Sequence, residues 1–241
     1  MIDIDLITSK YKPKDYALDY SMGTPVPWIT FDDFLPDDLL ATVQEEIDSI
    51  PNHIWTKFTR NGSSMLECNT FKYSPNIREL VLNLNSGEFV TWLENITGLK
   101  KIIPDPLLIG AGLMRCSNGH SLKLHTDFNW NEQLRLNRSL SAILYLSKEW
   151  DPSWEGSLEF WDLDRKACVH KIEPRPNRLL VWNYHDLLVH GHPNPIQCPE
   201  GSSRDGLRMF YFTSNATPVN PPHRSLYWFG DNGAYDIREN Q

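Results

Sequence analysis

Hydrophobic positions follow a helical period in the first hundred residues of the chain and a strand-like pattern after about residue 105. In residues 33–52, apolar side chains recur at the three- and four-residue spacing of a buried helix face. Pro36 suits the first turn of this helix, because proline lacks only an N–H that has no helical partner there. The same spacing predicts a helix after Pro75 and another over 88–96, with Gly98 as its stop.

Short apolar runs separated by Gly, Pro, Asn and Asp clusters predict strands in the second half of the chain. The expected strands cover residues 107–114, 139–146, 158–161, 167–172, 178–182 and 207–213. One earlier strand is expected over 26–31. Many short strands with long loops are typical of an antiparallel sandwich or jelly roll. Helices followed by strands predict an α+β protein with a double-stranded β-helix core and N-terminal helices packed outside the sheet.

The chain shows no internal repeat and no sharp change of composition, and its 241 residues suit one domain. We expect a mainly helical portion over 1–104, a jelly-roll core over 105–217 and a tail over 218–241. The tail contains Tyr227 and Trp228. A disordered terminus rarely carries such rings, so the tail is expected to pack on the core.

Charge and cysteine content narrow the function further. The net charge of −8 and the lack of a Lys/Arg block predict no binding to nucleic acid. No apolar run has the length of a membrane span, and the N-terminus lacks the apolar centre of a signal peptide. The four cysteines are widely spaced and are expected to be reduced thiols. These features predict a cytoplasmic protein, and they give no indication of its oligomeric state.

The candidate chemistry starts at His125 and Asp127, which lie two residues apart. On a strand such residues point to the same face, so the imidazole and the carboxylate can bind one ion together. A histidine from a distant strand would complete a set of two histidines and one carboxylate, which suits iron(II) in oxygenases. His185, His190 and His192 are the candidates for this third ligand, and strand parity does not choose between the last two.

An arginine at the start of the last long strand is the candidate partner of a dicarboxylate. Arg204 precedes the strand that runs over 206–213, and Arg208 lies on the same face two pleats later. The planar guanidinium binds both oxygens of a carboxylate, so either residue could serve.

Five segments of the chain together resemble the catalytic core of the prolyl 4-hydroxylase-like branch of the 2-oxoglutarate/iron(II)-dependent oxygenases. They occur in the order typical of that family, lie within residues 122–213, and read HTDFNW (125–130), RSLSAILYLSKEW (138–150), WEGSLEFWD (154–162), RPNRLLVW (175–182) and HGHPNPIQCPEGSSRDGL (190–207). The segment WITFDDFLP (28–36) resembles the N-terminal portion of such enzymes less specifically.

The resemblance implies a single oxygenase domain with iron held by His125, Asp127 and His190. It implies Arg204 as the partner of the remote carboxylate of 2-oxoglutarate, with the hydroxyl of Tyr145 assisting. The cosubstrates would be 2-oxoglutarate and O₂, with ascorbate as a candidate reductant. The implied reaction is hydroxylation of an unactivated C–H bond, coupled to conversion of 2-oxoglutarate to succinate and CO₂.

The substrate is left open by the sequence. A prolyl residue of a peptide, an amino-acid-like molecule and another small molecule all fit the implied chemistry. Asn129, Trp130 and Trp154 are expected on loops at the mouth of the site, where aromatic rings could receive a flat apolar group.

Three positions depart from the pattern of the family. Gly206 stands where a hydroxyl residue is common, and Glu155-Gly156 replaces a pair of glycines. Arg115-Cys116 stands where an aromatic residue often precedes the HxD strand. These changes leave Arg115 and Arg208 as alternative partners of the cosubstrate, or a different 2-oxo acid as the cosubstrate.

Three other functions compete with the oxygenase hypothesis. A non-catalytic or sensing relative would bind metal without turnover, but the intact His/Asp/His set favours catalysis. A cupin-type metalloenzyme would not use 2-oxoglutarate and would not need Arg204. A sugar-binding sandwich would leave the His/Asp/His set without a role.

Overall fold

The computed structural model describes residues 2–71, 74–215 and 217–228. The helices are α1 (Ile4–Ser9), α2 (Pro13–Met22), α3 (Asp37–Ser49), α4 (Pro75–Leu84) and α5 (Gly87–Thr97), with 3₁₀ turns at Asn52–Ile54 and Pro152–Trp154. The strands are β1 (Trp28–Phe31), β2 (Thr56–Arg60), β3 (Ser63–Cys68), β4 (Ile102–Pro104), β5 (Gly112–Cys116), β6 (Leu122–Thr126), β7 (Trp130–Asn131), β8 (Leu136–Tyr145), β9 (Leu158–Trp161), β10 (Cys168–Ile172), β11 (Leu179–Asn183), β12 (His190–His192), β13 (Arg204–Thr213) and β14 (Leu226–Tyr227).

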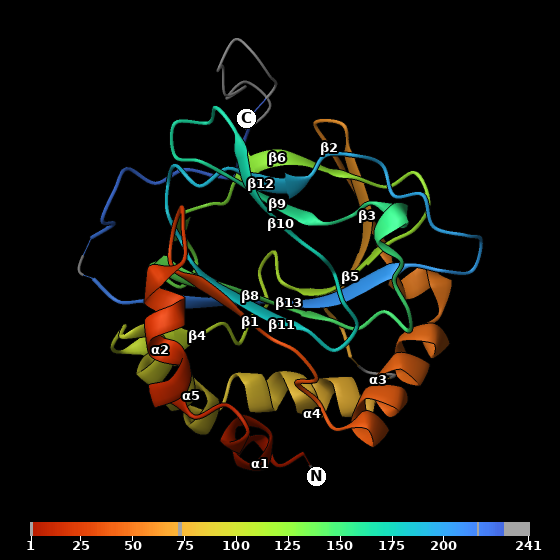
Figure 1. Ribbon diagram of the computed structural model, residues 1–241, viewed down its shortest axis with the longest axis horizontal. Coiled ribbons are helices and arrows are strands. Elements are labelled where there is room, and N and C mark those ends of the chain that lie inside the picture. Colours follow the sequence, from red (N-terminus) through yellow and green to blue (C-terminus); the bar gives the residue numbers. More distant parts are fainter. Residues whose placement is uncertain (1, 72–73, 216, 229–241) are drawn as a thin grey trace.

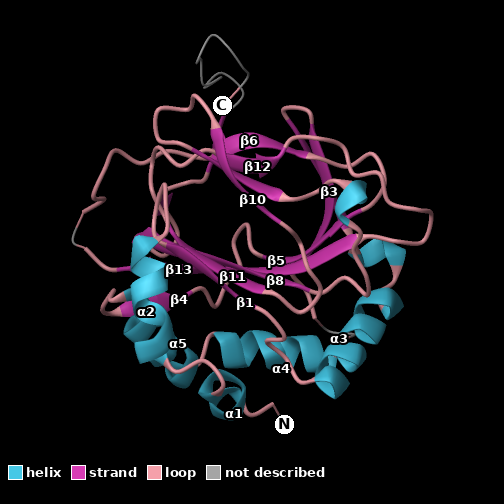
Figure 2. Cartoon of the chain, viewed as in Figure 1, coloured by secondary structure: helices cyan, strands magenta, loops and turns pink. Residues whose placement is uncertain are grey.

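The strands of the described residues form two antiparallel sheets that face each other (Figure 1). The larger, nine-stranded sheet has the order β1-β11-β8-β13-β5-β3-β2, with β4 paired to β13 and β7 to β8. The smaller, five-stranded sheet has the order β10-β9-β12-β6-β14. Figure 2 shows the helices gathered on the outer face of the larger sheet. The α+β jelly roll with external N-terminal helices is therefore confirmed.

The helices predicted from the apolar spacing are all present, the first with shorter bounds and the third one residue longer at each end. The helix expected over 33–52 is α3, preceded by Pro36 at its N-cap. The helix expected after Pro75 is α4, and the third is α5. Gly98 ends α5 with a φ of 74°, a left-handed conformation that favours glycine. None of the helices among the described residues has the length and apolar character needed to cross a membrane.

The prediction of a strand over 107–114 is wrong for its first residues, because the observed strand starts later. The Asp105 carboxylate accepts hydrogen bonds from the backbone N–H groups of Leu107 and Ile109, which holds this stretch in a turn. Leu108 has a φ of 49°, and the strand β5 begins only at Gly112. A local side-chain acceptor thus outweighed the apolar character of the run.

The residues of the larger sheet divide between two hydrophobic clusters, because alternate side chains of a strand point to opposite faces. On β8, Leu140, Ala142 and Leu144 face the helices, whereas Ile143 and Tyr145 face the smaller sheet. The outer cluster lies between the larger sheet and the helices and includes Phe31, Phe34, Leu80, Leu93, Leu140, Leu144 and Leu207. The inner cluster lies between the two sheets and includes Met114, Cys116, Ile143, Tyr145, Phe160, Trp182 and Ile196.

Candidate metal and cosubstrate site

Neighbouring strands of the smaller sheet bring the candidate metal ligands together. His125 lies on β6 and is paired with His190 on β12, and Asp127 directly follows β6. The two imidazole rings lie with their centroids 4.6 Å apart. Sequence separation of the two histidines is large, so this pairing depends on the antiparallel register of the sheet.

Among the described residues, His125, Asp127 and His190 are grouped closely enough to hold a metal ion. Their ligand atoms all lie within 4.8 Å of one another. The Nε2 atom of His125 is 3.5 Å from Oδ1 of Asp127, and the Nε2 atom of His190 is 3.3 Å from Oδ2. Both imidazoles are buried, and the carboxylate is largely buried.

Backbone carbonyls orient both imidazoles toward the shared ion position. Nδ1 of His125 lies 2.8 Å from the Lys123 carbonyl oxygen, and Nδ1 of His190 lies 3.3 Å from that of Leu188. A hydrogen on Nδ1 donates to the carbonyl, which leaves the Nε2 lone pair free for a metal. Burial and the neighbouring His190 lower the pKa of His125, so its imidazole is neutral, as a ligand must be.

Arg138 is a site residue that the sequence reasoning missed. It lies on β8, is buried, and its Nη2 is 2.7 Å from Oδ2 of Asp127. Its guanidinium lies over the ring of Phe210 at 3.5 Å and donates to the hydroxyl of Ser141. Burial would raise the pKa of Asp127, but Arg138 holds that pKa well below its usual range. The sequence offered one signal for this residue, namely an arginine within a strand whose other residues are mostly buried.

The donor set fits a divalent iron. Two imidazoles and one carboxylate on neighbouring strands are the donor set that iron(II) oxygenases use. Bound there, iron(II) with 2-oxoglutarate and O₂ supplies the oxidant for hydroxylation of a C–H bond. The protein residues would hold the ion, fix the imidazole tautomers and keep Asp127 ionised.

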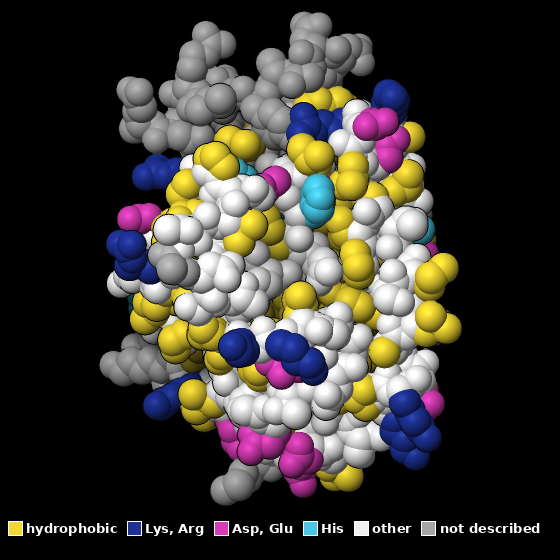
Figure 3. All heavy atoms as spheres, turned by 90° about the vertical axis from the view of Figure 1, so that its left-hand side faces the viewer, with side chains coloured by type: hydrophobic (Ala, Val, Ile, Leu, Met, Phe, Trp, Pro, Cys, Tyr) yellow, Lys and Arg dark blue, Asp and Glu magenta, His cyan; other side chains and the backbone are white. Residues whose placement is uncertain are grey.

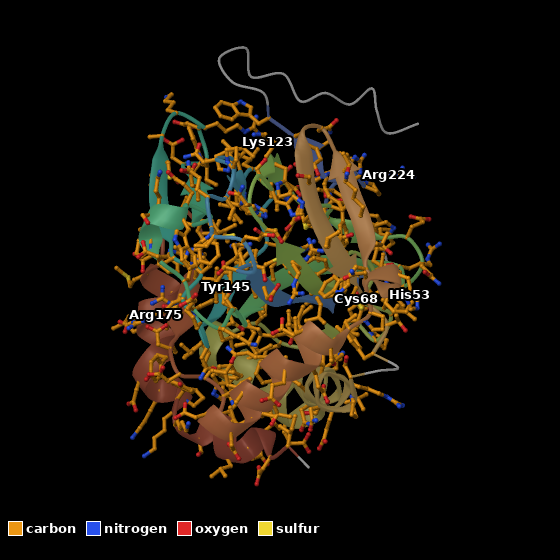
Figure 4. The ribbon with its side chains drawn as sticks, turned by 90° about the vertical axis from the view of Figure 1, so that its right-hand side faces the viewer. His53, Cys68, Lys123, Tyr145, Arg175 and Arg224 are labelled. Carbon is orange, nitrogen blue, oxygen red and sulfur yellow. The ribbon has the colours of Figure 1, made fainter. Side chains whose placement is uncertain are left out.

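Arg204 and Tyr145, the two candidate cosubstrate residues, are in contact at the inner cluster. Arg204 opens β13 and is 1% exposed, and Tyr145 is fully buried. Nη2 of Arg204 donates to the Tyr145 hydroxyl at 3.3 Å, while its Nε has no partner among the described residues. Figure 4 shows Tyr145 in the interior and Arg175 at the periphery. Since Tyr145 accepts from Arg204, its own O–H is available to donate to an anion.

The alternative arginines are each paired with a carboxylate. Arg115 donates to Asp205 through Nε at 2.8 Å and also binds Asp48 on α3. Arg208 forms an ion pair with Glu67 on β3. A buried guanidinium without an acidic partner is costly, and Arg204 has none within the described parts of the chain.

The departures from the family pattern have local explanations. A Cβ on Gly206 would lie 2.9 Å from Cε of Met114, so the Met114 side chain takes the space of the missing hydroxyl. A Cβ on Gly156 would lie 3.0 Å from Trp150 and 3.3 Å from Cδ of Arg204. Gly156 therefore lets its loop pack closely against the stem of Arg204.

The other candidate histidines lie apart from the three grouped side chains. His185 is exposed, and its Nδ1 accepts from the backbone N–H of Leu187. His192 is 2% exposed and faces Cys116, with Nε2 at 3.9 Å from the sulfur.

A cavity of about 290 Å³ adjoins the grouped side chains through Arg138. Its lining includes Arg138, Tyr184 and Asn129, and the Tyr184 hydroxyl lies 3.3 Å from the carbonyl oxygen of Asp127. Tyr184 donates to Asp186, which also lies 3.2 Å from Nε2 of His223 in the tail. The loop after β13 that contributes to this lining lies at the left of Figure 1. On the face seen from that side, hydrophobic and polar side chains are interspersed (Figure 3).

The aromatic residues expected at the mouth divide between two places. Trp130 lines a second hollow of about 400 Å³ together with Phe128 and His223. Trp154 instead packs edge-on against Trp150, with the ring centroids 5.4 Å apart, beside the inner cluster. Asn129 holds the tail, because its side chain accepts from the N–H of His223 and donates to the carbonyl of Pro221.

Comparisons with known proteins show what this chain is similar to. Residues 111–212 match the family described as the 2OG-Fe(II) oxygenase superfamily. No curated protein sequence matches the chain. The structure of a prolyl 4-hydroxylase from Pseudomonas putida is 18% identical, with a TM-score of 0.58 over 84% of this chain and 99% of that chain.

Two further structures share the fold. A Trichoplax adhaerens prolyl hydroxylase in complex with a hypoxia inducible factor peptide is 14% identical, with a TM-score of 0.62 over 88% of this chain and 94% of that chain. HygX from Streptomyces hygroscopicus, with nickel, 2-oxoglutarate and hygromycin B bound, is 11% identical, with a TM-score of 0.56 over 86% and 90% of the respective chains.

Residues 111–212 of the chain are thus similar to the 2OG-Fe(II) oxygenase superfamily, and the chain has the fold of prolyl hydroxylases. It is accordingly a 2-oxoglutarate-dependent dioxygenase whose cofactor is iron and whose cosubstrates are 2-oxoglutarate and O₂.

Proposed function

We propose that this dioxygenase hydroxylates a C–H bond with iron held by His125, Asp127 and His190, and with the remote carboxylate of 2-oxoglutarate bound by Arg204 and Tyr145. The observation that carries the cosubstrate assignment is the buried charge of Arg204, which has no acidic partner among the described residues. Arg115 and Arg208 already have acidic partners, so they offer less to a further carboxylate. The hydrogen bond between Arg204 and Tyr145 supports a joint role.

The proposed substrate is a peptidyl or small-molecule compound, with a prolyl residue or an amino-acid-like molecule as the preferred candidates. The cavity beside Arg138 supports a substrate of this kind, because its volume of about 290 Å³ is near the lower end of the range of ligand pockets. Nη1 of Arg138 has no partner within the described residues and could donate to a carbonyl or carboxylate oxygen of the substrate. The neighbours with this fold include proteins bound to a peptide and to hygromycin B.

We also propose that residues 1–241 act as one oxygenase domain. The described part of the tail supports this, because β14 pairs with β6 and the N–H of Trp228 donates to the carbonyl of Leu124. The end of the predicted tail, residues 229–241, lies outside the described residues. The cytoplasmic location stays a prediction.

Release of succinate from 2-oxoglutarate tests the proposed function. The protein is given Fe(II), O₂ and ascorbate, and uncoupled turnover is measured without a substrate. We expect His125→Ala and Asp127→Ala to reduce succinate formation by about 100-fold or more, because each removes a metal ligand.

Matched controls are His53→Ala and Asp164→Ala. Both side chains are exposed, and Figure 4 shows His53 at the periphery. Succinate formation that survives both site substitutions would contradict the proposed metal site. Metal binding by the unaltered chain without any succinate formation would favour a sensing role.

A further inference from the structure

An imidazole, a thiol and a guanidinium meet between the two sheets, outside the proposed metal ligands. They belong to His192, Cys116 and Arg204, which are 2%, 0% and 1% exposed. Cys116 on β5 is paired with Arg204 on β13, and its sulfur lies 3.9 Å from Nε2 of His192. His192 is therefore a polar side chain at the proposed cosubstrate pocket that the function has not yet used.

A shift in strand register separates His192 from the proposed metal ligand His190. On the β12–β6 ladder, His190 pairs with His125, but His192 pairs with Leu122. Gly191 permits this close approach, because a Cβ there would lie 2.6 Å from the carbonyl oxygen of Leu122. As a result, His192 faces Cys116 while His190 faces Asp127.

The contacts of His192 indicate which ring nitrogen carries the hydrogen. An imidazole with one hydrogen carries it on either Nδ1 or Nε2, and Nε2 faces the Cys116 sulfur at 3.9 Å. Burial raises the pKa of the Cys116 thiol, which keeps its proton and can donate it to Nε2. The imidazole hydrogen then sits on Nδ1, which has no hydrogen-bond partner among the described residues.

We infer that Nδ1–H of His192 donates a hydrogen bond to the remote carboxylate of the 2-oxo acid, beside Arg204 and Tyr145. This inference rests on the proposed function, because it assumes that the anion bound at Arg204 is that carboxylate. His192 would supply the donor that Gly206 does not provide. It would also satisfy a buried N–H that otherwise has no partner, which is energetically unfavourable.

The test measures cosubstrate binding directly. The protein loaded with Mn(II), without O₂, is titrated with 2-oxoglutarate by calorimetry. We expect His192→Leu to raise the Kd of 2-oxoglutarate by about 10- to 100-fold, as for loss of a hydrogen bond to a charged group. His192→Asn, whose Nδ2 lies close to the position of Nδ1, should restore the Kd to within a few-fold of the original.

A second ligand separates the remote carboxylate from the rest of the molecule. 2-Oxopentanoate has the same chain length as 2-oxoglutarate but lacks the remote carboxylate, so its weaker binding should be unchanged by His192→Leu. The affinity for Mn(II) should also be unchanged, and thermal unfolding should show that both variants are folded. His53→Leu, at an exposed position, is the control for substitution itself.

The outcomes distinguish the inference from the proposed function. If the unaltered chain bound Mn(II) but not 2-oxoglutarate, the proposed function would fail and the inference with it. If the chain bound 2-oxoglutarate and His192→Leu bound it equally well, only the inference would be overturned. Equal weakening of 2-oxopentanoate binding would show that His192 does not act on the remote carboxylate and would also overturn it.

Discussion

The two faces of the larger sheet are both buried, but they differ in which of their buried polar atoms have hydrogen-bond partners. In the outer cluster the indole of Trp92 donates to the carbonyl of Tyr11, and the hydroxyl of Tyr211 donates to that of Leu84. In the inner cluster and beside it, Nε of Arg204, Nδ1 of His192 and Nη1 of Arg138 have no partner among the described residues. On the helix side, Ser74 Oγ and Asn85 Oδ1 also lack partners among the described residues, but both lie at the ends of α4. The inner face, in contrast, has nitrogen donors left over beside the proposed ligand site.

This contrast indicates that the outer face mainly stabilises the fold and that the inner face mainly binds ligands. Close packing of apolar side chains against the helices stabilises the fold, since most of that surface is removed from water. The unpaired donors of the inner face are unfavourable without a ligand, and binding of a ligand to the folded state alone would stabilise it. Substitutions on the two faces should therefore separate stability from binding.

The largest expected effect is on stability, at the outer face. Leu80 on α4 is fully buried, and Leu80→Ala should lower the free energy of unfolding by about 2–5 kcal/mol through lost burial and a cavity. Leu82 on the same helix is 61% exposed, and Leu82→Ala should change the free energy of unfolding by less than about 0.5 kcal/mol. Urea unfolding measures both. A weaker 2-oxoglutarate affinity in the folded Leu80 variant would contradict the separation of stability from binding between the two faces.

A somewhat smaller effect is expected on binding, at the inner face. Arg204→Met should raise the Kd of 2-oxoglutarate by about 100-fold, because a charge-assisted contact to the carboxylate is lost. Its unfolding free energy without cosubstrate should stay the same or rise, since the substitution removes a buried charge that has no acidic partner within the described parts of the chain. Calorimetry and urea unfolding measure the two quantities.

Arg208→Met provides the matched control for this substitution. It breaks the ion pair with Glu67 and should lower stability while changing the Kd by only a few-fold. If Arg208→Met weakened 2-oxoglutarate binding as strongly as Arg204→Met, the assignment of the cosubstrate partner would be wrong.

The smallest expected effect concerns an ion pair at the end of the larger sheet. Hydrogen bonds from Arg178, and the charge of Arg175, lower the pKa of Asp32 despite partial burial. A carboxyl with a lowered folded-state pKa stabilises above its unfolded pKa, near about 4, and loses this contribution as the pH falls through the folded value.

Asp32→Asn should therefore cost up to about 1 kcal/mol at pH 7, because the pair is partly exposed and screened by solvent. The difference from the unaltered chain should shrink below about pH 4 and then vanish. Urea unfolding across this pH range measures it, with Asp164→Asn as an exposed control. A difference that stayed constant with pH would show that Asp32 does not act through its charge.

The sequence predicted what depends on periodicity and local spacing. The helices α3, α4 and α5 were found because their apolar faces repeat regularly, and most core strands were found as short apolar runs. The helices α1 and α2 and the hairpin of β2 and β3 were missed, since α2 and β2 have few buried residues and α1 is short.

The grouping of His125, Asp127 and His190 was predicted, but its surroundings were not. The contact of Arg138 with Asp127 joins residues eleven positions apart across a loop, and no sequence period reports it. The separation of His192 from His190 depends on a register shift at Gly191. Strand parity assumed a regular ladder and therefore could not distinguish the two histidines.

The short strand β14 has a consequence for solubility. It occupies the end of the smaller sheet, where Leu226 pairs with Thr126 and Tyr227 pairs with His125. Without it, the backbone of β6 would present free N–H and C=O groups to other molecules, and such open edges recruit strands from neighbouring chains. Two residues of the tail thus shield the metal-site strand against self-association as well as adding a ring beside His125.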